Sequence, residues 1–353
     1  MLLFDEFQNR CASAPPYRRC EFAFLNETGI DQGAPIRALF EEAFKFYTGN
    51  KDAIRARFRS LQNATHFGAA FELFLHELAR RKSLQPLADA QVPGGNVDLQ
   101  ITRAGTGIAY IEARMLQPGE NVHYSAACDA INRVKVQGIQ LNLRLKRAPQ
   151  HSLNLKALVT QLSAHLSTID LATIATDPGE NRASKFTYEE KEALFEILPV
   201  RSDSSPGGLG VSDYPDDELV EEEDIRLALE RKNKKYGQMG HPYVVAICSS
   251  KGFATDEIFE DALFSTSPGD ERGFFVRSKR SRVSGVLACQ CFRPSSLSGA
   301  RMRMYLNPNA DHPLSDSVFG CDLAIRADDK FSIAHGSAVA DIMGLPSGGY
   351  RSQ

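Results

Sequence analysis

Two short segments of alternating polar and apolar residues, joined by a glycine-rich turn, constrain the fold of this chain most. They form the stretch NVDLQITRAGTGIAYIEARM at residues 96–115. Side chains in a β-strand alternate between two faces, so Asp98 lies opposite its apolar neighbours in the first segment and Glu112 does so in the second. With a turn at Gly105-Thr106-Gly107, the stretch predicts a β-hairpin. If the polar faces of its two strands coincide, the two acids can converge on one cation.

Composition and charge limit the class of protein. The chain has 353 residues, of which 42% are hydrophobic and 24% are charged, with 21 Phe and no Trp. This length suits one large domain or two ordinary ones, and this composition suits a globular protein with a sizeable core. The formal net charge is −3, so any surface that binds nucleic acid has to be local.

The cellular compartment is predicted from apolar runs and cysteines. The first residues, MLLFDEFQNR, have too few apolar residues for a signal peptide. The longest apolar runs, such as YVVAIC, have the length of a strand, so no membrane span is expected. Seven cysteines occur without a CxxC pair, which favours reduced thiols and a cytoplasmic location.

Hydrophobic periodicity predicts the order of elements. Helices are expected over 34–47, 51–62 and 65–83 before the hairpin. After the hairpin we expect a helix at 124–135, a strand at 136–147, a helix at 155–170, a hairpin at 186–200, a helix at 218–237, a strand at 242–250, a helix at 254–264 and a final β section. A segment rich in Gly, Pro, Ser and acids predicts a flexible loop at about 200–220. The expected organisation is a helical N-terminal extension over 1–60 and a single α/β domain over 61–353.

The order of acidic residues resembles a known superfamily. A helix with Glu72, a strand with Asp98, a strand ending Glu112-Ala113-Arg114, and then a helix and a strand resemble the PD-(D/E)XK nucleases over a core of residues 65–145. The resemblance implies a restriction-endonuclease-like fold, a mixed sheet flanked by helices, here with an additional C-terminal α/β section. It also implies Mg²⁺ or Mn²⁺ held by Asp98 and Glu112 with help from Glu72.

The resemblance departs from the superfamily pattern at one chemically important position. Arg114 occupies the place of the motif Lys, and Val97 precedes Asp98 where the pattern prefers Pro. Arginine can clamp a phosphate, but it stays charged near neutral pH and cannot act as a base. Catalysis is then either retuned or lost, and Lys135 after the next helix is one possible substitute for the motif Lys.

A second resemblance covers most of the chain. Segments such as PIRALFEEAFKFY, FGAAFELFLHELARR and SRVSGVLACQCFRP are similar to segments of uncharacterised bacterial proteins of similar length. This resemblance implies a shared architecture without a stated activity.

Basic clusters are candidates for contact with a phosphate backbone. They occur at 231–236, at 277–282 and at 301–303. The second cluster is favoured because it lies beside two phenylalanines; its charged residues are Arg277, Lys279, Arg280 and Arg282. Charged helix ends and solvated loops explain the clusters equally well. His76, four residues after Glu72, is on the same helical face, but neither an HExxH nor a Walker A nor a GxSxG motif is present.

These observations favour metal-dependent phosphodiester hydrolysis of nucleic acid, with DNA as the expected substrate. Two alternatives remain open. One is an inactive nuclease-like module that binds nucleic acid or a partner protein, and the other is an interaction protein whose acids form surface ion pairs. No dimerisation helix is legible, so the sequence leaves the oligomeric state open.

Overall fold

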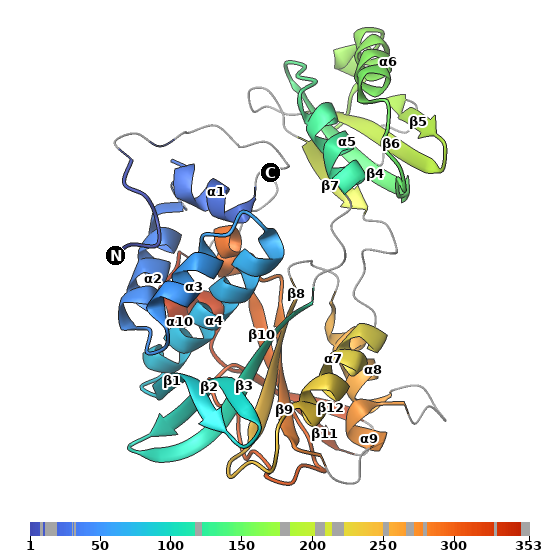
Figure 1. Ribbon diagram of the computed structural model, residues 1–353. Helices are drawn as coiled ribbons and strands as arrows, with labels where there is room; N and C mark the ends of the chain where they lie inside the picture. The colour runs from blue at the N-terminus through green and yellow to red at the C-terminus, as the bar shows by residue number, and fades with distance from the viewer. Residues whose placement is uncertain are drawn as a thin grey trace. The chain divides into compact units, whose positions relative to one another are not determined.

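The computed structural model divides into two compact units (Figure 1). It describes residues 1–7, 10, 20–29, 31, 33–116, 122–176, 184–201, 209–213, 222–249, 254–265, 272–277, 281–327 and 330–346. The first unit comprises residues 1–14, 20–117 and 220–353, and the second comprises residues 15–19 and 118–219. The chain is therefore a mixed α/β protein whose second unit is inserted into the first.

This division differs from the single domain that the sequence predicted over 61–353. Residues 1–60 are not a separate extension either, because their helices share a core with the helix at 63–81 and with the sheet. Local periodicity predicts where a helix or strand forms, but it carries no information about which core that element joins.

An eight-stranded mixed sheet forms the middle of the first unit. Its order is β1-β2-β3-β8-β9-β10-β11-β12. β3 pairs in parallel with β8, and β8 pairs in parallel with β9, whereas β1, β2 and β3 form an antiparallel meander. The strands are β1 (Gln85–Val92), β2 (Gly95–Arg103), β3 (Thr106–Leu116), β8 (Tyr243–Ser249), β9 (Val283–Gln290), β10 (Arg301–Leu306), β11 (Asp322–Ala327) and β12 (Lys330–Ala334).

Helices cover both faces of this sheet (Figure 1). One face packs against α1 (Glu21–Glu27), α2 (Gly33–Phe46), α3 (Lys51–Phe58), α4 (Asn63–Arg81), η4 (Pro294–Gly299) and α10 (Val339–Met343). The other face packs against α7 (Glu222–Lys235), α8 (Asp256–Phe264) and α9 (Phe274–Arg277). The mixed sheet flanked by helices agrees with the fold class predicted from the sequence.

The predicted hairpin at 96–115 is present as β2 and β3. Its turn is one residue earlier than expected, because β2 ends at Arg103 and β3 begins at Thr106. Ala104 and Gly105 have φ angles of 49° and 82°. Two consecutive residues with positive φ fit the tight hairpin turns whose twist matches that of the paired strands.

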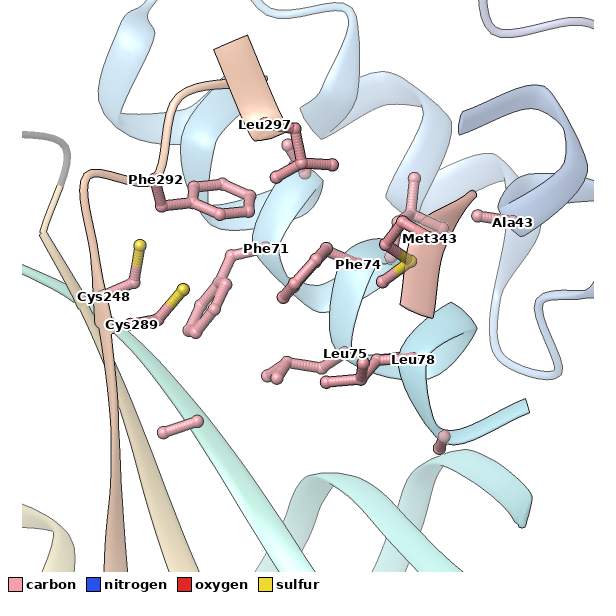
Figure 2. Close-up of a cluster of buried hydrophobic side chains, with 14 of the residues drawn as sticks. Ala43, Phe71, Phe74, Leu75, Leu78, Cys248, Cys289, Phe292, Leu297 and Met343 are labelled. Carbon is pink, nitrogen blue, oxygen red and sulfur yellow. The ribbon is translucent and has the colours of Figure 1, made fainter. Parts of the chain in front are cut away.

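Aromatic packing joins α4 to the sheet. Phe71 and Phe74 lie on the buried stripe of α4 and contact Phe292, with ring centroids 5.2 and 5.3 Å apart. Figure 2 shows the rings of Phe71 and Phe292 beside Cys248 and Cys289, which project from β8 and β9. Edge-on packing of this kind is favourable for aromatic rings, and it fixes the helix that bears Glu72.

The second unit is built around a four-stranded sheet with the order β5-β6-β4-β7. Its elements are α5 (Val122–Asn132), β4 (Ile139–Arg147), α6 (Leu155–Ser167), η1 (Leu171–Thr173), β5 (Phe186–Glu190), β6 (Ala193–Arg201) and β7 (Leu209–Asp213). Apolar residues of α5 and α6 pack on this sheet and form a core of their own. Part of the loop predicted at about 200–220 is therefore the strand β7; residues 202–208 and 214–221 lie outside the described residues.

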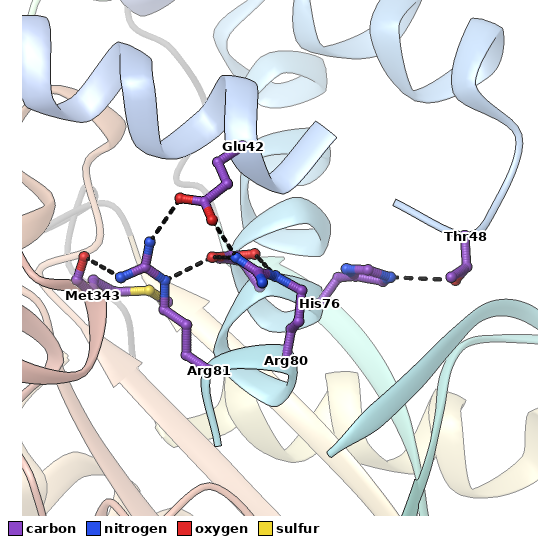
Figure 3. A network of polar contacts seen from close by, with 7 residues as sticks. Glu42, Thr48, His76, Arg80, Arg81 and Met343 are labelled. Atoms are coloured by element: carbon purple, nitrogen blue, oxygen red, sulfur yellow. Dashed lines mark hydrogen bonds and ion pairs between the residues drawn. The ribbon is translucent and has the colours of Figure 1, made fainter. Parts of the chain in front are cut away.

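An ion network around the buried Glu77 ties α4 to α2 and α10 (Figure 3). Glu77 is 1% exposed and accepts hydrogen bonds from Arg80 and Arg81 over 2.6–2.8 Å. Both arginines also contact Glu42, and Arg81 donates to the carbonyl of Met343. A buried carboxylate needs such donors in place of water, so this network holds α10 against α4.

The helices and cysteines of the described residues bear on membrane insertion and on disulfide formation. None of their helices combines the length and apolar character that crossing a bilayer requires. The six cysteines among them are free thiols: Cys20, Cys128, Cys248, Cys289, Cys291 and Cys321.

We predict that Glu77→Gln lowers the free energy of unfolding by about 1–3 kcal/mol, because the new amide cannot accept all the bonds of the carboxylate. Glu42→Gln is the matched control: its side chain is 43% exposed, and we expect a loss under about 1 kcal/mol. Urea denaturation of the two variants measures the difference. Equal losses would contradict the buried role of Glu77.

Candidate active site

Glu112 is a buried acid in the middle of the large sheet. It belongs to β3, which lies between β2 and β8, and it is 1% exposed. It is in register with Val245 of β8, whose side chain belongs to the core under α7. Because residues paired in register share a face of the sheet, Glu112 points toward α7.

Three donors from the C-terminal end of α7 surround Glu112. Lys232 Nζ and Lys235 Nζ lie 2.5 and 2.7 Å from Oε1, and the Tyr236 hydroxyl lies 2.5 Å from Oε2. Their spacing of three and four residues places them on one face of the helix. Burial alone would raise the pKa of Glu112, but these hydrogen bonds outweigh it, so the pKa is lowered and the carboxylate is ionised.

The sequence of α7 explains this arrangement. Ile225, Ala228 and Leu229 form the buried stripe of the helix, and Lys232 and Tyr236 continue that stripe at helical spacing. The first turn is acidic and the last turn is basic, which complements the helix dipole. The sequence did contain a signal for this site: a lysine stands at a position where the spacing of the buried stripe predicts an apolar residue.

The next residues anchor this end of α7 to the β1–β2 turn. The Gly237 amide donates to the Pro93 carbonyl over 2.7 Å, and the Tyr236 hydroxyl lies 2.6 Å from the Asn96 carbonyl. A Cβ atom on Gly237 would lie 3.0 Å from Pro93. The close approach of the two backbones therefore favours glycine at position 237.

Asp98 is the second acid of the site. The pairing of β2 with β3 ends at Leu99 and Ile111, and just beyond it Asp98 Oδ2 accepts the Ala113 amide over 2.7 Å. Burial, followed by the charges of Glu112 and Glu72, raises the pKa of Asp98 to about 7. The hairpin thus brings together the two acids that the sequence predicted as metal ligands.

Glu72 lies near this pair but is already paired with an arginine. Its two carboxylate oxygens accept hydrogen bonds from Arg57 of α3 over 2.5 and 2.6 Å. It acts on Asp98 through its charge. Because the arginine occupies both oxygens, Glu72 is not placed as a free ligand.

Arg114 and Lys135 are the two basic residues that the sequence suggested for the site. Arg114 is exposed, and its side chain makes no hydrogen bond or ion pair to another residue that the structure describes. Lys135 belongs to the second unit, where it donates to Asn132 over 3.1 Å. The sequence pointed to Lys135 because it follows the next helix along the chain, but that helix, α5, belongs to the other core.

His76 is a buried residue of α4 and not a ligand of this site. Its Nε2 atom lies 3.2 Å from the Thr48 hydroxyl (Figure 3). Burial lowers the pKa of His76 to about 4, so the ring is neutral at physiological pH.

Two of the four residues predicted to contact nucleic acid lie within the described residues. Arg277 pairs with Glu230 of α7. Arg282 donates to the carbonyls of Asn233 and Tyr236. Lys279 and Arg280 lie outside the described residues. Within the described residues, then, both arginines of the cluster bind other parts of the protein.

Asp98 and Glu112 form a donor set that suits a hard divalent cation. Asp98 Oδ1 has no hydrogen-bond partner within the described part of the chain, and repulsion from Glu112 contributes to its raised pKa. Mg²⁺ commonly binds through one or two carboxylates and completes its shell with water and substrate phosphate. No group of three or more His, Cys, Asp or Glu among the described residues is arranged to hold a metal, so the fit is to a two-carboxylate site.

Comparisons of the chain with protein-family models, curated proteins and solved structures gave no match.

We predict that Asp98→Asn raises the free energy of unfolding at pH 8 by at least about 1 kcal/mol, measured in the presence of a chelator. The pKa of Asp98 rises from an ordinary value of 3.8 to about 7. Between those values the folded protein keeps a proton that the unfolded chain has lost, so wild-type stability falls as pH rises through that window. The gain should shrink toward pH 4. Asp89→Asn, an exposed change on β1, is the control, and an equal gain there would contradict the assignment.

Proposed function

We propose that this protein hydrolyses phosphodiester bonds in nucleic acid with the help of a divalent metal, and that DNA is its substrate. The observation that carries the proposal is the meeting of Asp98 and Glu112 across one hairpin with Lys232 from another element. Two acids and a lysine are the chemical groups of the PD-(D/E)XK motif, which the sequence resembles. A nucleic-acid partner and a cytoplasmic location belong to the same proposal.

The order of elements in the first unit supports the resemblance. α4 is followed by the meander β1-β2-β3, and after residues 118–219 the chain continues with α7 and β8, which pairs in parallel with β3. This order of a helix, three strands, a helix and a strand supports the fold that the resemblance implies. The resemblance then no longer covers residues 65–145 as one core, because α5 and β4 belong to the inserted unit.

Lys232 is the residue we assign to the role of the motif lysine. Its side chain is 19% exposed, against 43% for Lys235. A lysine ammonium is a compact point charge with three donors, whereas the guanidinium of Arg114 is planar and extended. Lys232 can therefore orient a water or hold a phosphate oxygen beside Glu112.

The two acids are the residues that would hold Mg²⁺ or Mn²⁺, which supplies charge neutralisation and a water of lowered pKa when bound. Glu112 keeps its charge through its three donors, and Asp98 loses its proton near neutral pH. Lys235 and Tyr236 keep the Glu112 carboxylate in one orientation. The chain thus supplies ionised ligands and one positive group at the same place.

A second candidate is an inactive nuclease-like module that binds nucleic acid or a protein. One observation favours it: both oxygens of Glu112 already accept hydrogen bonds from Lys232, Lys235 and Tyr236. Such a closed cluster can serve as a structural ion pair without a metal. Metal binding and cleavage separate the two functions.

We predict metal-dependent cleavage of DNA by the wild type and its loss in an Asp98→Ala/Glu112→Ala double variant. Lys232→Met should lower the rate by about 10²- to 10³-fold, because a charge-stabilising group is removed. Lys234→Met changes an exposed lysine of the same helix and should cut like the wild type. The assay uses supercoiled, linear and single-stranded DNA and RNA with Mg²⁺ or Mn²⁺. No cleavage of any of them by the wild type would favour the inactive module.

We also predict that Lys232→Met binds Mn²⁺ more tightly than the wild type when no nucleic acid is present. The ammonium group and the cation compete for Glu112 Oε1, so removing the former should raise the affinity several-fold, measured by calorimetry. Asp98→Asn should lower the affinity, since one charged ligand is lost. If neither variant changes the Mn²⁺ affinity, the cation does not bind at these acids.

A further inference from the structure

We propose that Arg282 is a positioning residue of the Glu112 site. By holding the last turn of α7, it sets Lys232, Lys235 and Tyr236 against the carboxylate. The inference rests on the proposed role of that site, although its test needs no catalytic activity. It replaces the sequence-based assignment of Arg282 as a contact to nucleic acid.

Arg282 makes three hydrogen bonds to the end of α7. Its Nη1 atom donates to the Asn233 carbonyl over 3.1 Å and to the Tyr236 carbonyl over 2.5 Å. Its backbone amide donates to Asn233 Oδ1 over 3.1 Å. The last carbonyls of a helix have no partner within the helix. The two N–H groups of one guanidinium nitrogen can donate to two carbonyls at once.

The residues held in this way are those that reach Glu112. Arg282 binds the carbonyls of Asn233 and Tyr236. Asn233 directly follows Lys232 in the sequence, and Tyr236 directly follows Lys235. Their contacts with Glu112 are 2.5–2.7 Å long. A rotation or fraying of this turn would therefore lengthen all three contacts together.

Together with a second hydrogen bond, Arg282 holds the last turn of α7 from two sides. On one side the Gly237 amide is bonded to the Pro93 carbonyl of the β1–β2 turn. On the other side Arg282, immediately before β9, binds the carbonyls of Asn233 and Tyr236. The end of α7 is thus fixed between two strands of the sheet that also bears Glu112.

The test measures how readily the lysines react with an amine-acylating reagent, residue by residue, by mass spectrometry. Lys232 and Lys235 should react at least about fivefold faster in Arg282→Ala than in the wild type, which corresponds to losing one hydrogen bond of ordinary net strength. Arg282→Lys retains the charge and some donors, so it should restore part of the protection. Lys51, whose Nζ donates to the Lys45 carbonyl, serves as the internal reference.

Arg277→Ala is the matched control. Arg277 also binds α7, but through the side chain of Glu230, and its loss should leave both labelling rates unchanged. Unchanged labelling in Arg282→Ala would overturn the proposal, above all if the variant binds a DNA oligonucleotide more weakly. An equal rise for Lys51 would also overturn it, because it would indicate general loss of stability. Arg282 is exposed, so its variants leave the hydrophobic core unchanged. The labelling does not depend on catalysis, so it tests the proposal even if the wild type cuts no substrate.

Discussion

The buried carboxylate of Glu112 is the group on which the arrangement of the first unit depends. Taking a carboxylate out of water is unfavourable unless charged donors replace the solvent. Lys232, Lys235 and Tyr236 do so from α7, so α7 has to pack on β3 with its C-terminal turn over the acid. Burial, followed by repulsion from Glu112, raises the pKa of Asp98, whereas the hydrogen bonds from α7 lower the pKa of Glu112.

The inserted unit interrupts the chain within a crossover. Parallel strands cannot be joined by a tight turn and need a connection that crosses the sheet. Between the parallel strands β3 and β8 that connection contains α7, and the residues of the second unit precede α7. The second unit has its own sheet and core. Its presence in the crossover separates Glu112 from its lysines by more than a hundred residues of sequence.

The elements with a strong local pattern were predicted with small errors at their ends. The expected helix at 34–47 is α2 (Gly33–Phe46), and the expected hairpin at 96–115 is β2 and β3. Lys135 was assigned a role because it followed the next helix along the chain. The structure places Lys135 in the inserted unit, because the residues that follow the hairpin in sequence join a different core.

The sequence by itself determined that Asp98 and Glu112 each lie opposite the apolar neighbours of their own strand, because alternation in strands is fixed by the geometry of each residue. It also predicted a helix over 218–237, which contains α7. Only the tertiary structure decided that the end of α7 lies at Glu112, that Arg57 binds Glu72, and that Arg282 faces the helix end. Those contacts join residues far apart in the chain, and the periodicity of a short segment does not specify the partner against which it packs.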